Sequence, residues 1–283
     1  PTLGYDTTMV NFLRVWSARS PKQIDMQSFN SGQYVKAMAE RELAEVISKI
    51  LYPNDDSYQG KELRLKQQYF FSSASVQYAV SDFLKVYGPN WSIFPDKVAI
   101  HINDTHPAVA IPELMRVLMD EHDLGWDEAE DICRRTFAYT NHTVLQEALE
   151  RWPESLFAET LPRIYMILQE MNRRLCEKLW KSYPGQWERI GHMAILGYNQ
   201  AHMANLCVAY AHSVNGVSAI HTDILKKQTF HDFYILEPQK FVSITNGITH
   251  RRWLIQCNPG LSSLIDEAIG DGWRKDMDQL IRL

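Results

Sequence analysis

The stretch "VAIHINDTHPAVAIPEL" (residues 98–114) changes from an apolar strand pattern to a polar cluster within a few residues. It begins with β-formers such as Ile100 and Ile102, yet the run "NDTHP" (103–107) follows directly. β-Branched residues favour strands, whereas short polar residues and proline favour turns. The pattern predicts a strand over 97–102. Its polar end either turns the chain or presents functional groups at the edge of a sheet.

Outward from this strand, apolar segments and helical spacings alternate along the chain. Three further strands are predicted, over 136–140, 217–221 and 241–245. Apolar residues at helical spacing predict helices over 33–51, 61–87, 111–122, 127–135, 155–182 and 199–214. Asn215 and Gly216 are expected to stop the last of these helices. Strands that alternate with helices are typical of βαβ units. The sequence therefore predicts a helix-rich α/β fold with a mostly parallel sheet.

The composition narrows the class of protein. The chain has 283 residues, of which 45% are hydrophobic, and a net charge of -5 spread over both signs. This balance argues against a nucleic-acid partner, which usually requires a basic surface, and no apolar run is long enough to predict a membrane span. Four widely spaced cysteines indicate reduced thiols in a cytoplasmic protein. They are Cys133, Cys176, Cys207 and Cys257.

Each predicted strand finishes in polar residues. The four ends read "NDTHP" (103–107), "TNHT" (140–143), "HTD" (221–223) and "TNGITHRRW" (245–253). Ligands of open parallel sheets bind beyond the carboxyl ends of the strands. Asn, Asp, Thr and His both donate and accept hydrogen bonds, which suits a polyhydroxylated ligand. Turn chemistry alone explains any one cluster about equally well, but four together favour a binding site.

Some of these polar residues have other interpretations. Asp104 and His106 are possible metal ligands, but no clear third ligand accompanies them, so we expect no metal site. Asp104 and Glu150 are possible partners in glycoside hydrolysis, which needs two carboxyl groups at a fixed separation. A structural salt bridge from Glu150 to Arg151 or a neighbour is an equally good interpretation. We interpret His101 as a structural residue of the strand.

Several motifs together resemble the glycogen and maltodextrin phosphorylases, in the same order and over nearly the whole chain. They are "LGYDTTMVNFLRVWSA" (3–18), "YPND" (52–55), "GKELRLKQQYF" (60–70), "NDTHP" (103–107), "IPELMRVL" (111–118), "AYTNHTVL" (138–145), "EALERWP" (147–153), "VNGVSAIH" (214–221) and "TNGIT-RRW" (245–253). The resemblance implies a partial Rossmann-like domain of the GT-B type. Residues 1–246 would be the later part of the N-terminal phosphorylase domain. Residues 247–283 would cross into a C-terminal domain missing from this chain.

The resemblance also implies an activity. Such enzymes phosphorolyse terminal α-1,4-glucosidic bonds with inorganic phosphate and release glucose 1-phosphate with retained configuration. Their cofactor is pyridoxal phosphate, whose phosphate takes part in proton transfer. Its Schiff-base lysine would lie beyond Leu283, so we expect the isolated chain to be inactive. The longer enzyme is expected to be a cytoplasmic homodimer. A non-catalytic α-glucan-binding module remains the alternative.

Carried over residue by residue, the resemblance implies the following substrate contacts. His142 is the expected catalytic residue, which would hold the glucosyl 6-hydroxyl and place its backbone carbonyl near the anomeric carbon. Asn246 would share that hydroxyl. Asp104 and His106 would line the acceptor side, where the departing glucan lies.

The resemblance further assigns Asp55 and Asp56 to a gate loop that controls access, with Arg64 as a neighbour, and places Trp253 against the cofactor. Two positions depart from the family pattern. His250 stands where proline is usual, which would loosen a rigid turn and shift Trp253. Asp56 stands where asparagine is frequent, and its charge would repel phosphate.

Overall fold

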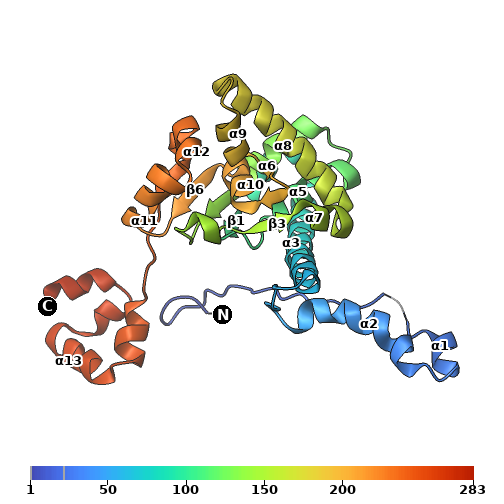
Figure 1. Ribbon diagram of the computed structural model, residues 1–283. Helices are drawn as coiled ribbons and strands as arrows, with labels where there is room; N and C mark the ends of the chain where they lie inside the picture. Colours follow the sequence, from blue (N-terminus) through green and yellow to red (C-terminus); the bar gives the residue numbers. More distant parts are fainter. Residues whose placement is uncertain (1, 22) are drawn as a thin grey trace. The chain divides into compact units, whose positions relative to one another are not determined.

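The structure, a computed structural model that describes residues 2–21 and 23–283, divides into two compact units (Figure 1). The larger unit is Trp16–Thr245, and the smaller one joins residues 2–15 to Asn246–Leu283. Each unit has an apolar core of its own. No helix within the described ranges is long and apolar enough to cross a membrane.

A four-stranded parallel sheet forms the centre of the larger unit. Its strands are β1 (Ile100–Asn103), β2 (Phe137–Thr140), β6 (Ser213–Gly216) and β7 (Phe241–Ser243), in the order β1-β2-β6-β7. Parallel strands place all their carboxyl ends at one edge of the sheet. The predicted helix-rich α/β class with a parallel, Rossmann-like sheet is confirmed.

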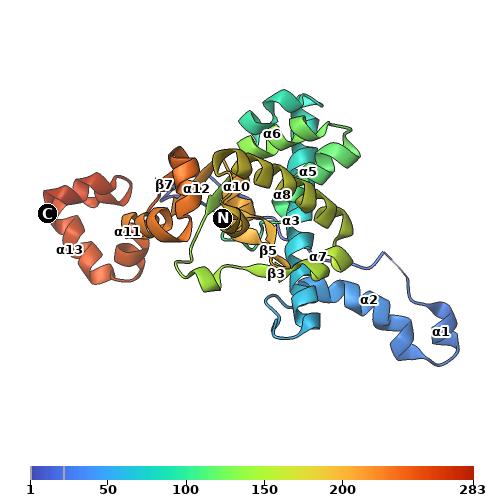
Figure 2. The same ribbon diagram turned by 45° about the horizontal axis from the view of Figure 1, so that its top comes forward.

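The larger unit also contains α-helices, most of which pack around the sheet and supply its core. These helices are α1 (Met26–Asn30), α2 (Tyr34–Lys49), α3 (Tyr58–Tyr87), α4 (Phe94–Lys97), α5 (Ala110–Arg116), α6 (Trp126–Thr136), α7 (Glu154–Thr160), α8 (Pro162–Ser182), α9 (Trp187–Met193), α10 (Met203–Tyr210), α11 (Ala219–Ile224) and α12 (His231–Leu236). Helices α1 and α2 extend away from the sheet (Figure 1). Helix α3 packs on α5, and α5 packs on α8 (Figure 2). Every residue of α10 is buried, as expected of a helix enclosed by the core.

The third predicted strand was wrong. Residues 213–216 form β6, and the segment predicted as a strand over 217–221 instead begins α11, where the Ser218 hydroxyl accepts from the His221 amide. Gly216 ends β6 so close to α11 that a Cβ there would come within 2.6 Å of Thr222 Oγ1. Glycine therefore serves a close helix–strand approach, whereas the sequence suggested a helix stop.

Two predicted helices were wrong in extent. The helix expected over 199–214 is reduced to α10, because a strand occupies each end of that range. The helix expected over 155–182 is two helices, α7 and α8, that meet at Leu161. Pro162 occupies the first turn of α8, where a missing N–H costs no helical hydrogen bond.

A small antiparallel sheet escaped prediction altogether. It consists of β3 (Arg151–Pro153), β4 (Leu196–Gly197) and β5 (Gln200–His202), in the order β3-β5-β4. Tyr198 and Asn199 connect β4 to β5 with φ values of 55° and 58°, the left-handed conformation of tight hairpin turns. Strands of two or three residues are too short to show a period of two.

The smaller unit is built around α13 (Pro259–Ile269). Its core contains the fully buried Trp273, whose indole Nε1 donates to Asp266 Oδ1 at 2.9 Å. Arg274 donates to the Tyr5 hydroxyl at 3.3 Å, so the amino-terminal residues belong to this unit through a side-chain contact.

Candidate active site at the strand ends

The polar residues predicted at the ends of β1 and β2 follow directly after the last paired residues. The hydrogen-bond ladder continues one step past each strand: Asp104 N donates to Thr140 O at 2.9 Å, and Asn141 N donates to Asn215 O at 3.0 Å. Asp104 then takes a left-handed conformation (φ 62°), and its Oδ1 accepts from Thr105 N at 2.6 Å. The chain turns at this point, with its polar groups fixed at the sheet edge.

His142 is the exposed histidine that follows β2. Its Nε2 lies 2.6 Å from Oδ1 of Asn103, the last residue of β1. An amide oxygen only accepts, so the imidazole Nε2–H donates in this pair. The hydrogen bond therefore connects the two strand ends and fixes the orientation of the ring.

A layer of buried polar groups lies beneath these exposed side chains. Thr140 Oγ1 donates to Asn215 Oδ1 at 2.7 Å, and Asn141 Nδ2 donates to the Tyr139 hydroxyl at 3.0 Å. Asn141 Oδ1 also accepts from Thr143 N at 3.0 Å. Buried polar networks whose members are paired make a structure rigid.

His101 is hydrogen-bonded to this buried layer but is not itself buried. It is exposed on β1, and its Nε2 is hydrogen-bonded to the Thr140 hydroxyl. The contact joins β1 to β2 at the level of the polar network, which agrees with its interpretation as a structural histidine.

A cavity of about 310 Å³ brings part of the expected gate loop to this edge of the sheet. Its lining includes Asp55, Arg64, Asp104, His106 and Glu150. Three of the five residues predicted to bind substrate therefore share one cavity, together with the predicted neighbour Arg64.

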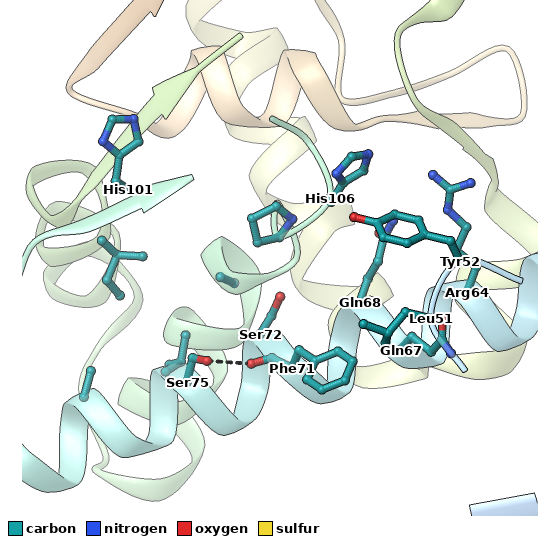
Figure 3. A pocket seen from close by; sticks show the side chains of 15 residues that line it. Leu51, Tyr52, Arg64, Gln67, Gln68, Phe71, Ser72, Ser75, His101 and His106 are labelled. Carbon is teal, nitrogen blue, oxygen red and sulfur yellow. Dashed lines mark hydrogen bonds between the residues drawn. The ribbon is translucent and has the colours of Figure 1, made fainter. Parts of the chain in front are cut away.

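Tyr52 connects the loop to the sheet edge, which the sequence did not indicate. Figure 3 shows Tyr52 between His106 and Arg64. The centroid of the Tyr52 ring lies 6.1 Å from that of the His106 ring and 6.0 Å from the Arg64 guanidinium carbon. Aromatic and cation–π contacts at these distances are weakly attractive.

Arg64 connects the gate loop to Glu150. Its Nη1 donates to Asp55 Oδ2 at 2.7 Å, and its Nη2 lies 3.7 Å from Glu150 Oε2. Gln68 donates to the same Glu150 oxygen at 3.0 Å. The structural role weighed for Glu150 thus has a partner, which is Arg64 rather than Arg151.

Two buried polar atoms of the cavity lining have no hydrogen-bond partner among the described residues. They are Glu150 Oε1 and the indole Nε1 of Trp152. Such atoms are costly unless a water or a ligand satisfies them. The lining residues of the cavity thus include one acceptor and one donor that are buried without a partner among the described residues. The sequence singled out the Glu150 carboxyl group but not Trp152, which lies on the unpredicted strand β3.

The remaining predicted residues lie elsewhere. Asp56 is exposed and outside the lining of this cavity, and its amide donates to Asn54 Oδ1 at 2.8 Å. Asn246 and Trp253 belong to the smaller unit, where both side chains are exposed. Their placement against substrate and cofactor stays a prediction.

His250, the departure from the family pattern, is anchored within the smaller unit. Its Nε2 lies 3.1 Å from Trp273 O. The next residue, Arg251, donates to Arg274 O at 3.2 Å. These contacts hold the segment before Trp253 in place of the rigidity that proline would supply.

The four cysteines are free thiols, with Cys133 and Cys207 buried and Cys257 exposed. Burial raises the pKa of the Cys133 and Cys207 thiols well above the ordinary value. Within the described ranges, no group of three or more histidine, cysteine or acidic side chains is arranged to hold a metal ion.

A parallel sheet whose strand ends carry polar side chains beside a cavity defines an α/β protein with a candidate ligand site at the sheet edge. The family described as "Carbohydrate phosphorylase" matches residues 1–283. The chain therefore belongs to the carbohydrate phosphorylase family.

Relatives in this family are similar over the whole chain. It is 49% identical to the muscle form of glycogen phosphorylase from Homo sapiens and 48% identical to that from Bos taurus, covering 35% of each protein. It is 48% identical to the liver form from Ovis aries, of which it covers 34%. The chain thus spans about a third of the length of these curated relatives.

Proposed function

We propose that this chain supplies one wall of the active site of an α-glucan phosphorylase. In the reaction, the bond from the anomeric carbon of the terminal glucose to the glucan oxygen breaks. A phosphate oxygen forms the new bond with retained configuration, and the glucan oxygen takes up a proton. The observation that carries the proposal is the His142–Asn103 pair at the sheet edge, in a chain of the phosphorylase family.

His142 has the exposure and the support that this role needs. In the proposal its ring holds the glucosyl 6-hydroxyl, together with Asn246. Its backbone carbonyl faces the anomeric carbon and stabilises the positive charge that develops there. Fixed dipoles are effective in this way because they need little reorganisation during the reaction. The buried Asn141 on one side of His142 provides that fixed geometry.

Asp104 and His106 form the acceptor side in the same proposal. Both line the cavity together with Glu150 and Trp152, each of which has a buried polar atom without a partner among the described residues. A glucan offers hydroxyl groups that donate and accept, which matches this mixture of polar atoms. Because Arg64 and Gln68 already hold Glu150, its pairing favours a positioning role over the hydrolytic partnership with Asp104.

The loop that contains Asp55 and Asp56 is proposed to gate phosphate and glucan access. The Asp55 carboxylate forms a half-exposed ion pair with the Arg64 guanidinium. A competing anion can take the place of the carboxylate in this pair. The exposed Asp56 adds a negative charge that opposes phosphate.

Pyridoxal phosphate is the proposed cofactor, and its phosphate supplies acid–base chemistry when it is bound. Trp253 is 56% exposed on the helical turn Arg252–Gln256, so its indole is available to lie against such a planar group. Lys226 and Lys227 do not match the family's lysine motif; Lys226 is half-buried and Lys227 is exposed. In the same proposal, residues 1–246 belong to the later part of the N-terminal phosphorylase domain. Residues 247–283 form the crossover into the C-terminal domain.

A homodimer is proposed for the longer enzyme, in the cytoplasm, where free thiols such as those of this chain persist. Helix α2 carries large apolar side chains that are exposed in this chain. They include Tyr34, Val35 and Leu43. Exposed apolar patches of this kind mark protein interfaces.

The test compares the 283-residue chain with the longer product, if the reading frame continues past Leu283. Glucose 1-phosphate formation from maltoheptaose and inorganic phosphate is measured for both. We expect activity in the longer product and none in the chain alone.

The His142→Ala variant of the longer product should lose activity at least a hundred-fold, consistent with loss of a stabilising group in the transition state. An active His142→Ala variant, or phosphate-independent release of glucose, contradicts the proposal. Maltoheptaose binding without activity in the longer product indicates the non-catalytic module.

A further inference from the structure

His221 is a buried histidine that the predicted strand-end site did not include. It lies on α11 with 7% of its surface exposed, and both ring nitrogens have partners. Val217 N donates to its Nδ1 at 3.1 Å, and its Nε2 lies 3.2 Å from Asn141 Oδ1. Because Nδ1 accepts, the proton of the neutral ring is on Nε2, which donates to Asn141.

Asn141 receives this hydrogen bond at a position next to His142. Its side chain is fully buried, and the same Oδ1 accepts from Thr143 N, the residue after His142. Its Nδ2 donates to the Tyr139 hydroxyl. The amide of Asn141 is therefore held from three sides, and it contacts the chain on either side of His142.

We propose that His221 is a positioning residue for His142: its neutral ring holds the Asn141 side chain and thereby the backbone of residues 140–143. The inference rests on the proposed role of His142. Burial lowers the pKa of His221, which favours the neutral ring that the Val217 contact requires.

The chemistry of the position is specific. The ring accepts a hydrogen bond from one direction and donates a hydrogen bond in another, which glutamine can imitate and leucine cannot. A merely space-filling residue would tolerate leucine better than glutamine, because the site is buried. The two variants His221→Gln and His221→Leu therefore separate a positioning role from packing.

A matched control comes from the same helix. The Thr222 hydroxyl is buried and donates to Ser218 O at 2.8 Å; among the described residues it makes no hydrogen bond to the 140–143 segment. Thr222→Val removes a hydrogen bond of α11 while it keeps the shape of the side chain. Any effect that comes from α11 stability alone should appear in this variant as well.

The experiment is amide hydrogen exchange of Thr143 in the 283-residue chain, together with ring-nitrogen NMR of its histidines. We expect exchange roughly ten-fold faster in His221→Leu, the size of effect that one lost buried hydrogen bond produces. His221→Gln should stay within about three-fold of the parent and Thr222→Val close to it. Unchanged exchange in His221→Leu, or equal acceleration in all three variants, overturns the inference.

Ring-nitrogen NMR of the parent chain keeps the test decisive if His221→Leu does not fold. We expect a single tautomer of His221 with the proton on Nε2, and a proton on Nδ1 overturns the inference. Maltoheptaose titration of the same proteins separates the two proposals. Weaker binding in His221→Leu and its recovery in His221→Gln support both. If the parent binds no maltoheptaose, the sugar role of this wall fails, while the exchange data still decide whether His221 positions the segment.

Discussion

The strand-end wall and the gate loop each contribute residues to one cavity lining, and they are held in different ways. The wall consists of residues 103–106 and 140–143, and a layer of buried hydrogen bonds lies beneath it. The gate loop, residues 52–57, is held instead by an ion pair near the protein surface. Its ion pair joins Arg64 to Asp55, whose side chains are 23% and 41% exposed.

The difference predicts how the two parts respond to a ligand. Breaking one buried hydrogen bond leaves an unsatisfied group and costs about 1–3 kcal/mol. An ion pair near the surface contributes about 0–1 kcal/mol. The wall is therefore formed before a ligand arrives, whereas the loop can move at small cost. That combination suits a site in which the wall orients the sugar and the loop controls access.

The largest effect is expected for Asn141→Ala, in the centre of the wall. The substitution leaves two buried donors, Thr143 N and the His221 ring, without their acceptor. We expect the free energy of unfolding to fall by about 2–4 kcal/mol, as measured by urea denaturation. The control is Asn54→Ala in the gate loop, where an exposed side chain accepts from Asp56 N. Equal losses in the two variants would contradict the distinction between wall and loop.

A second substitution in the wall should have a smaller effect. Thr140→Val removes the hydroxyl that donates to Asn215 and that is bonded to His101, but it preserves the shape of the side chain. We expect a loss of about 1–2 kcal/mol because one partner, His101, is exposed and can bind water instead. A loss below about 0.5 kcal/mol would mean that this layer adds little to the wall.

The gate loop should respond in mobility rather than in stability. Arg64→Met removes the partner of Asp55, and we expect less than about 1 kcal/mol of global destabilisation. Limited proteolysis within residues 52–57 should become several-fold faster. High salt should accelerate cleavage of the parent chain but not of the variant, because salt screens the ion pair. The control is Lys66→Met, which removes a pair with Glu62 on the same helix α3. If that variant is cleaved as fast, the Arg64–Asp55 contact does not hold the loop.

The sequence predicted the two exposed ends of the wall but not its support. The ends of β1 and β2 follow from an apolar run that stops at polar residues, which is a local signal. The role of Asn215 and His221 depends on where β6 stops, and that point was misplaced because Gly216 suggested a helix end. Its true reason is the approach of Thr222 from the next helix, a contact that no local pattern contains.

Contacts across long sequence separations were invisible for the same reason. Tyr52 and His106 meet over more than fifty residues, and Trp152 is buried only because β3 pairs with β5. The family resemblance compensated in part, since it placed Asp55, Asp104 and His106 in one site before any geometry was known. The three residues line one cavity, and their contact with substrate stays a prediction.

The smallest effect is expected at Asp56, and it tests whether the exposed part of the loop acts only through charge. The described residues contain no ion pair of Asp56, and its side chain is exposed, so Asp56→Asn should change the free energy of unfolding by less than about 0.5 kcal/mol. Removing a charge about 8–10 Å from a phosphate in water is worth a few tenths of a kcal/mol. Phosphate binding, followed by ³¹P NMR at low ionic strength, should therefore tighten roughly two-fold, and the gain should disappear at high salt.

Asp55→Asn is the matched control, because it changes the charge equally but also breaks the contact with Arg64. If only the control speeds proteolysis of the loop while both variants tighten phosphate binding, Asp56 contributes charge and Asp55 contributes charge and anchoring. A gain for Asp56→Asn that persists at high salt would mean that the residue acts through loop conformation, and that the loop is more ordered than its exposed contacts indicate.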